Sequence, residues 1–182
     1  MDSKLQIISG DFRGRKLRLP AGARPTQNRA RIALFNMMSS LDVRATHVWD
    51  AFAGSGAFGI ECLSRWGDCC VVFTDINPAT VRANLAALNI GSRASVVAGD
   101  ALSVAARFGA DADLIFIDPP YADADLGVAL VRKIAAVARP GAIVVWEQDA
   151  PVSVLPDDAA WEILRDKQYG RARFMILRYR GG

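Results

Sequence analysis

Apolar runs alternate with amphipathic segments along most of the chain after residue 45. Five runs have the length and continuous hydrophobicity of buried strands. They cover residues 46–52, 69–75, 94–100, 113–118 and 142–148. Segments with helical character separate them, and one of these begins at Pro78 and ends before Gly91, as helices commonly do. Strands that alternate with helices in this way predict a parallel sheet covered by helices on both faces.

The tail of the chain departs from this alternation. Residues 161–180 contain two β-rich runs about a turn near Gly170, which predicts an antiparallel hairpin at one edge of the sheet. The expected fold is therefore α/β: a doubly wound, mostly parallel seven-stranded sheet that ends in an antiparallel hairpin.

Residues 1–44 also break the alternation. Two short apolar runs between residues 5 and 20 are strand candidates for a hairpin, and residues 25–41 predict a helix with a cap near Thr26. The apolar side chains of this helix recur at helical spacing and should pack on the main domain. They are Ile32, Leu34, Phe35, Met38 and Leu41. We therefore expect a small extension, residues 1–44, in front of a larger domain, residues 45–182.

Length and composition favour a globular protein without a metal. With 182 residues, 52% of them hydrophobic, the chain can bury a substantial core. No apolar run approaches the roughly 20 residues that span a bilayer, and the first residues lack the apolar stretch of a signal peptide, so we expect a cytoplasmic protein. The three cysteines lack metal or redox spacing and should be reduced core residues, and the single histidine makes a zinc site improbable.

The charge of the chain is unevenly distributed. Residues 1–44 hold nine Lys and Arg against three Asp and Glu, whereas the remainder holds 13 against 16. A basic front on a mildly acidic body suggests a polyanionic partner such as RNA, and the alternative is a solvated charged face. Arg29 and Arg31 should stay outside the core. The candidate RNA contacts are Arg13, Arg15, Lys16, Arg24, Thr26, Arg29 and Arg31.

A glycine motif follows the first predicted strand of the main domain. Gly54, Gly56 and Gly59 have the spacing of a dinucleotide fingerprint, which is a weak signal on its own. Asp50 stands four residues before the first glycine, where it would repel a pyrophosphate but could accept a hydrogen bond from an ammonium group. This pattern favours S-adenosylmethionine, because the glycines let the backbone approach its methionine part closely.

Two further acids end the next two strands. Asp75 is placed to accept hydrogen bonds from both ribose hydroxyls, and Asp100 could bind the adenine amino group. The carboxyl ends of parallel strands form the ligand crevice of such a sheet. Each acid alone could instead be a turn or N-cap residue. The candidate cofactor contacts are Asp50, Phe52, Ala53, Gly54, Gly56, Asp75, Ile76, Asp100 and Ala101.

The fourth strand ends in Asp118-Pro119-Pro120-Tyr121, and these four residues are the candidate catalytic group. The Asp118 carboxylate and the Pro119 carbonyl are acceptors with no competing proline N–H, which suits a planar exocyclic NH₂ group. Two fixed acceptors favour a pyramidal nitrogen aimed at the methyl donor, and Tyr121 offers a face on which an extruded base can stack. The alternative is a Pro-Pro turn with a packed tyrosine.

Several stretches together resemble the RsmD family, the bacterial 16S rRNA guanine-N2 methyltransferases. They are "IISGDFRGRKLRLP", "RPTQNRARIALFN", "DAFAGSGAFGIECLSRWG", "FTDINP" and "FIDPPY". The resemblance implies a class I S-adenosylmethionine-dependent methyltransferase fold and a guanine target in 16S rRNA, within an assembling small ribosomal subunit. It also implies that residues 1–44 bind RNA and that residues 45–182 are catalytic. We expect a monomer.

Three other functions remain open from the residues alone. A DNA adenine or cytosine amino-methyltransferase would use the same Asp118 corner, but the chain leaves no room for a separate DNA-recognition domain. A nicotinamide oxidoreductase is disfavoured by Asp50 and by the lack of a proton donor such as histidine in the crevice. A non-enzymatic RNA-binding assembly protein would not need the crevice at all.

Overall fold

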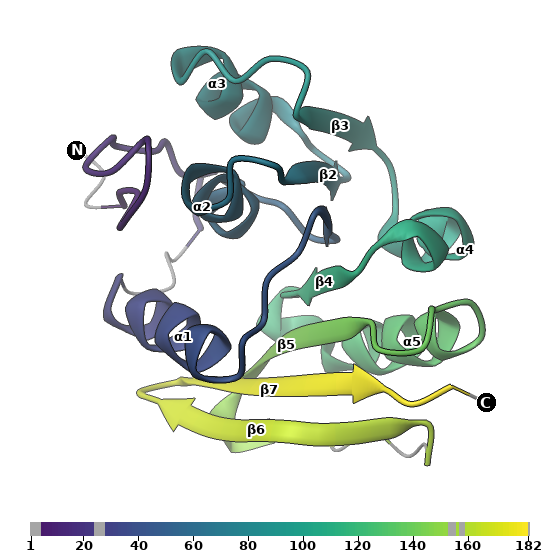
Figure 1. Cartoon of the computed structure of the whole chain (residues 1–182). Coiled ribbons are helices and arrows are strands. Elements are labelled where there is room, and N and C mark those ends of the chain that lie inside the picture. The colour runs from purple at the N-terminus through teal and green to yellow at the C-terminus, as the bar shows by residue number, and fades with distance from the viewer. Residues whose placement is uncertain (1–4, 24–27, 153–155, 157–158, 182) are drawn as a thin grey trace.

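The computed structural model describes residues 5–23, 28–152, 156 and 159–181. Its centre is one seven-stranded sheet in the order β3-β2-β1-β4-β5-β7-β6 (Figure 1). The strands are β1 (His47–Asp50), β2 (Cys70–Asp75), β3 (Ala94–Ala98), β4 (Leu114–Ile117), β5 (Ile143–Asp149), β6 (Trp161–Tyr169) and β7 (Ala172–Tyr179). Strands β1 to β5 pair in parallel, and β7 pairs antiparallel with both β5 and β6. The predicted doubly wound sheet and its terminal hairpin are therefore confirmed.

Five helices cover the sheet within the described residues. They are α1 (Asn28–Ser40), α2 (Ala57–Arg65), α3 (Ala79–Ala87), α4 (Ala101–Asp111) and α5 (Ala124–Ala135), with short 3-10 turns at Tyr121–Asp123 and Ala150–Val152. Apolar side chains from α1, α2 and α3 form one core with one face of the sheet, and those from α4 and α5 form a second core on the other face. We call these the α2 face and the α4 face. This division confirms that helices lie on both sides.

Alternation along the strands decides which residues meet each core. Val48, Phe116 and Val145 belong to the α2 face, whereas Trp49 and Ile115 belong to the α4 face. The aromatic packing on the α2 face links the layers, because the ring of Phe58 on α2 stacks on that of Phe116 with centroids 4.0 Å apart. The same alternation continues to the ends of these strands, so it determines which face the polar side chains there point to.

Residues 5–17 fold back on themselves without forming regular strands. The Leu17 N–H donates to the Leu5 carbonyl at 2.9 Å, and the Ile7 N–H donates to the Arg15 carbonyl at 3.0 Å. Within residues 5–23 the only bridge is Gln6 with Lys16. The predicted hairpin is therefore present only as this short pairing, since the next amides, of Ile8 and Ser9, donate to the Glu61 carboxylate on α2 instead.

Helix α1 packs as expected along most of its apolar side, with two differences. Leu34, Phe35 and Met38 are buried, but Ile32 is 41% exposed, so its expected packing is wrong. Arg31 is only 4% exposed, which contradicts the expectation that it lies outside the core. Its guanidinium donates to the Gln6 carbonyl and lies 3.7 Å from Glu61. The expected cap at Thr26 lies outside the described residues.

Three further features concern the cysteines, the lengths of the helices and the clustering of metal-binding side chains. Cys62 and Cys69 are free and buried, but Cys70 is exposed, so it is not a core residue. No helix within the described ranges is long and apolar enough to cross a membrane. Among the residues that the structure describes, no group of three or more His, Cys, Asp and Glu side chains could hold a metal ion.

Candidate active site

The candidate site lies at the carboxyl ends of the central strands. Strand order runs outward in opposite directions from β1 and β4, so these two neighbours flank the topological switch point at which such sheets bind ligands. Asp50 ends β1 and Asp75 ends β2, while Asp118 directly follows β4. By strand alternation, Asp50 and Asp118 continue the α2 face of β1 and β4. The fold therefore gathers the predicted acids at one edge.

Asp50 is a buried carboxyl group with an incomplete set of partners. It is 1% exposed, and one oxygen accepts a hydrogen bond of 3.1 Å from the Gly59 N–H. The other oxygen, Oδ1, has no hydrogen-bond partner among the described residues. Burial raises the pKa of Asp50 to about 7, the Gly59 hydrogen bond lowers it, and the nearby Asp75 raises it. A buried acceptor of this kind fits a cationic donor such as an ammonium group.

Asp75 is bound by the backbone around the glycine motif. Its two oxygens accept hydrogen bonds from the Gly54 N–H at 2.7 Å and from the Asn77 N–H at 2.8 Å. Because each carboxylate oxygen has two lone pairs, both can accept a further hydrogen bond. The large apolar side chain of Ile76, next to Asp75, is 83% exposed. Together they offer a polar acceptor and an apolar surface at the end of β2.

The three glycines of the motif have different structural reasons. A Cβ atom on Gly59 would lie 2.4 Å from the Phe73 ring, so this glycine permits close packing of α2 on β2. A Cβ atom on Gly56 would lie 2.7 Å from Val81, so this glycine permits close packing against α3. Gly54 has a φ of +54°, and a Cβ atom there would meet only Pro20, at 4.0 Å. Gly54 is therefore the glycine of the motif that leaves room for a ligand.

The other candidate cofactor residues are spread around this loop. Ala53 is buried and Phe52 half-buried, and the Ala53 N–H donates to the Thr74 carbonyl at 2.9 Å. Asp100 is exposed and caps α4 by accepting a 3.1 Å hydrogen bond from the Leu102 N–H, as the turn or N-cap alternative proposed. Ala101 is 2% exposed. The glycine motif therefore contacts two of the acids directly, because the Gly59 N–H binds Asp50 and the Gly54 N–H binds Asp75. Asp100 lies apart from the motif, at the start of α4.

The corner after β4 lines a small cavity. The cavity is bounded by Pro119, Pro120, Tyr121, Ala124, Trp146, Glu147, Gln148 and Asp149. Tyr121 is 41% exposed and its hydroxyl donates to Glu147 Oε1 at 3.3 Å. The guanidinium of Arg171, from the turn between β6 and β7, lies 5.3 Å from the centroid of the Tyr121 ring and forms two 2.8 Å hydrogen bonds with Asp149. The terminal hairpin therefore helps to hold the aromatic ring of the corner.

Electrostatics single out Asp118 within this corner. Burial raises its pKa well above the ordinary value for an aspartate, and the neighbouring carboxyl groups of Glu147 and then Asp50 raise it further. Tyr121 also has a raised pKa, first through burial and then through Glu147 and Asp118. A cluster of like charges holds its protons more tightly than usual. The corner therefore offers hydrogen-bond acceptors, and its carboxyl group takes up a proton more readily than an ordinary aspartate.

Comparison with known proteins identifies the family of the chain. A family model described as conserved hypothetical protein 95 matches residues 5–178. The ribosomal RNA small subunit methyltransferase D of Escherichia coli is 34% identical over 179 residues, which are 95% of this chain and 89% of that protein. The chain belongs to this family, the RsmD family. The Haemophilus influenzae protein of the same name is 30% identical over 95% of this chain and 93% of its own length.

Solved structures share the fold of this chain. The structure of yhhF from Escherichia coli superimposes with a TM-score of 0.80 at 32% identity, covering 97% of this chain and 98% of that chain. An RNA methyltransferase from Salinibacter ruber, in complex with S-adenosyl-L-homocysteine, has a TM-score of 0.66 at 16% identity and covers 87% of this chain and 95% of that chain. At this low identity the second likeness concerns the fold, which is that of class I methyltransferases.

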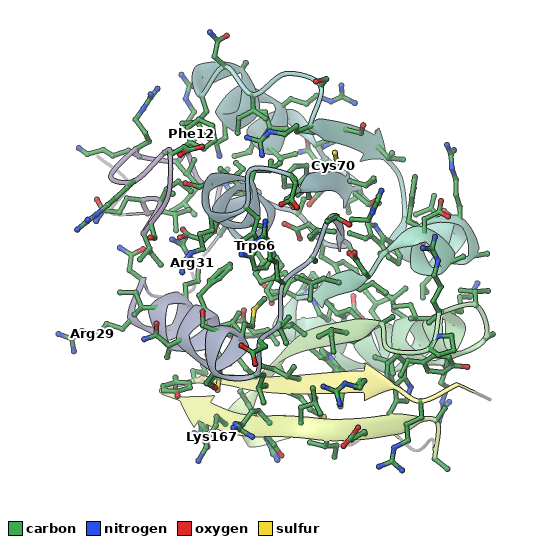
Figure 2. The ribbon with its side chains drawn as sticks, in the orientation of Figure 1. Phe12, Arg29, Arg31, Trp66, Cys70 and Lys167 are labelled. Atoms are coloured by element: carbon green, nitrogen blue, oxygen red, sulfur yellow. The ribbon has the colours of Figure 1, made fainter. Side chains whose placement is uncertain are left out.

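The candidate RNA contacts of this RsmD-family chain are placed unequally. Arg13, Arg15, Lys16 and Arg29 are exposed. Figure 2 shows Arg29 pointing away from α1, whereas Arg31 points into the molecule toward α2. Burial therefore removes Arg31 from the set of surface contacts. Arg24 and Thr26 lie outside the described residues.

Four contributors were not predicted from the sequence: Glu61, Asn84, Glu147 and Arg171. The Asn84 amide accepts from the Arg18 N–H at 2.8 Å and donates to the Arg18 and Ser55 carbonyls, so it ties the front segment to the glycine loop. Glu147 lies within an apolar strand run, where a charged residue is itself a signal because buried charges require a reason. The other three contribute through segments distant in sequence, which no local pattern reveals.

Proposed function

We propose that the protein transfers a methyl group from S-adenosylmethionine to the exocyclic N2 of a guanine in 16S rRNA during assembly of the small ribosomal subunit. One observation carries the proposal: the acceptor corner at Asp118 and the unpartnered carboxylate oxygen of Asp50 lie on the same face of neighbouring strands. The first feature suits an exocyclic amine, and the second suits the amino group of the methyl donor. Relatives named as ribosomal RNA methyltransferases support the RNA target.

The residues around the glycine motif fit S-adenosylmethionine. Asp50 Oδ1 would accept a hydrogen bond from its ammonium group, and Gly54 leaves space for its methionine part. Asp75 would accept hydrogen bonds from the ribose hydroxyls, with Ile76 packing against the adenine and Asp100 near its amino group. Phe52, Ala53, Gly56 and Ala101 shape this loop. When bound, the sulfonium group supplies an activated methyl group.

The corner after β4 would hold the acceptor nitrogen. Asp118 and the Pro119 carbonyl would accept its two N–H groups, which draws the lone pair out of the ring and orients it. The methylated nitrogen is transiently acidic, and the raised pKa of Asp118 suits a group that receives its proton. Tyr121, held by Arg171 and Glu147, would stack on the flipped base.

The front segment would supply the contacts to the RNA backbone. Arg13, Arg15, Lys16 and Arg29 are exposed cations on residues 5–40, and Arg24 and Thr26 complete the proposed set. Because phosphate contacts are independent of sequence, they would position the RNA while the pocket selects the base. We infer that residues 1–44 act as the RNA-binding part and residues 45–182 as the catalytic part.

Methyl transfer with labelled donor tests the proposal. The protein is incubated with tritiated S-adenosylmethionine and, separately, with 16S rRNA transcript, duplex DNA, and small subunits from a strain that lacks the gene. We expect label in RNA from the subunits, at the N2 of one guanine after nuclease digestion and chromatography. Label in DNA, or on an adenine or cytosine amine, would replace the proposal with another amino-methyltransferase activity. No label in any substrate would refute the enzymatic function.

A further inference from the structure

Glu147 is a second carboxyl group beside the proposed amine clamp. Strands β4 and β5 pair in parallel up to Ile117 with Trp146, so the next residues, Asp118 and Glu147, stand side by side. Strand alternation directs Glu147 to the α2 face, the face of Asp50 and Asp118. Glu147 is 2% exposed and lines the cavity at the corner together with Pro119 and Tyr121. Glu147 therefore lines the cavity, and Asp118 lies beside Glu147 at the end of the neighbouring strand.

Tyr121 and Arg31 lie close to the carboxyl group of Glu147. The Tyr121 hydroxyl donates to Oε1 over 3.3 Å, a long contact that holds the group in place. A carboxylate has about four lone-pair sites, so it can accept several hydrogen bonds at once. Burial lowers the pKa of Arg31, while the nearby carboxylates of Glu61 and then Glu147 raise it, so this guanidinium lies close to Glu147.

The Asp118 corner alone cannot choose among bases. Adenine, cytosine and guanine all carry an exocyclic amine that two acceptors would bind. The bases differ at the ring nitrogen next to that amine: guanine has an N1–H donor there, whereas adenine and cytosine have an acceptor. A carboxylate facing this position gains a hydrogen bond with guanine, and with the other two bases it faces a lone pair. Selection of this kind is strong because the mismatched pair leaves a buried polar group unpaired.

Resting on the proposed function, we propose that Glu147 reads the Watson–Crick edge of the target guanine by accepting its N1–H, while Asp118 holds the N2 amine. Two carboxyl groups on adjacent strands thus match the two adjacent donors of guanine. Glu147 sets base specificity, and Asp118 serves the methyl-transfer step. The gap between parallel strands, about 4.8 Å, is of the size that brings both groups to one base edge.

A base analogue distinguishes recognition of the guanine N1–H by Glu147 from a general contribution of Glu147 to catalysis. 2-Aminopurine keeps the amine at C2 but has an acceptor at N1, and an amide side chain at position 147 can donate to that acceptor. Single-turnover transfer is measured on two synthetic RNAs that carry guanine or 2-aminopurine at the modified position, with wild type and Glu147→Gln. We expect the wild type to favour guanine by about 10- to 100-fold, and Glu147→Gln to reduce that preference by at least tenfold. 2-Aminopurine also lacks the O6 atom of guanine. The effect of that second difference cancels when the preference of Glu147→Gln is compared with the preference of the wild type.

Controls make every outcome decisive. Glu162→Gln on β6, whose carboxylate pairs with Arg178 at 3.6 Å outside the crevice, should keep the wild-type preference. If the wild type methylates guanine but Glu147→Gln keeps the same preference, the inference is wrong and the proposed function stands. If the wild type labels no guanine, the proposed function itself fails. Should Glu147→Gln not fold, Glu147→Asp carries the test: withdrawing the carboxylate should slow transfer to guanine at least tenfold with cofactor affinity retained, and a wild-type rate would overturn the inference.

Discussion

Two groups of buried carboxyl side chains lie on the α2 face, and their partners differ. Glu61 on α2 is 0% exposed, yet it accepts hydrogen bonds from the Ile8 and Ser9 amides at 2.8 and 3.0 Å and from the Arg65 Nε at 2.7 Å. The Arg31 guanidinium lies 3.7 Å away. Every one of these partners belongs to the protein, and together they attach the front segment to α2.

Within the described residues, Asp50 at the end of β1 and Asp118 after β4 have no comparable compensation. Asp50 receives one hydrogen bond, from Gly59, and the pKa values of Asp50 and Asp118 are raised primarily by burial. A buried charge is tolerated when it is paired and hydrogen-bonded, as Glu61 is. The difference supports the proposal that Asp50 and Asp118 bind groups of a ligand, whereas Glu61 stabilises the fold.

Removing Glu61 should produce the largest effect on stability. Glu61→Ala leaves the buried Arg31 without its carboxylate and frees two backbone amides, so we expect unfolding free energy to fall by about 3–5 kcal/mol. Urea denaturation monitored by circular dichroism measures it. The matched control is Glu162→Ala, whose exposed pair with Arg178 should contribute less than about 1 kcal/mol. Equal small effects for both variants would erase the distinction between the two groups of carboxyls.

Asp118 should behave in the opposite way, with a large effect on rate and little on stability. Asp118→Ala removes an acceptor that acts on the developing charge, so we expect single-turnover methyl transfer to fall by about 10²–10³-fold at saturating cofactor. Asp118→Asn should be milder, because an amide oxygen still accepts a hydrogen bond. Unfolding free energy should not decrease, because the substitution removes the unfavourable contact between the carboxyl groups of Asp118 and Glu147. A wild-type rate in Asp118→Ala would exclude the corner as the amine clamp.

The sequence predicted the elements of both regions better than their connections. Continuous apolar runs identified β1 to β5 because both faces of a parallel sheet are buried, and the turn at Gly170, whose φ is +59°, was recognisable between the β-rich runs of the tail. The acids at the ends of β1, β2 and β4 were also predicted, because strand ends are defined once the strands are. Local pattern was sufficient for each of these.

Interactions between distant segments account for what was missed. Arg31 was expected outside because it is charged, although it precedes Leu34 and Phe35 by three and four residues and therefore shares their buried side of α1. Its partners, Gln6 and Glu61, come from other segments. Likewise, the pairing of residues 5–17 stops early because Glu61 competes for two amides. Such competition depends on tertiary contacts that periodicity does not contain.

The two groups of carboxyls should also differ in pH dependence. With a pKa of about 7, Asp50 is mostly protonated at pH 6 and ionised at pH 8, and only the ionised form pairs with an ammonium group. We expect S-adenosylmethionine affinity, measured by calorimetry, to rise about tenfold between those pH values.

Without ligand the pH dependence of stability has the opposite sign. The raised pKa of Asp50 makes folding take up a proton, so this contribution to stability is lost as pH rises from the ordinary value of 3.8 through about 7. Asp50→Asn should flatten both profiles, and an unchanged affinity profile in that variant would contradict the assigned pairing.

The smallest expected effect concerns the surface of the segment that Glu61 holds. Arg13 and Arg29 are exposed, so the double substitution Arg13→Ala with Arg29→Ala should leave stability and cofactor affinity unchanged. It should weaken RNA binding and reduce the slope of log affinity against log salt by about one unit for each lost phosphate contact. Binding is measured by filter retention of RNA over a series of salt concentrations.

The matched control is Arg107→Ala with Arg139→Ala, two exposed arginines on α4 and just beyond α5, which should keep the wild-type slope. If both double variants change the slope equally, RNA binding depends on the total charge of the protein, and the front segment is not a specific RNA-binding part. If only the Arg13 and Arg29 double variant changes the slope, the segment that the buried Glu61 carboxylate anchors is an RNA-binding surface. The carboxyl groups at the strand ends then keep a separate proposed role, which is to bind the methyl donor and the base.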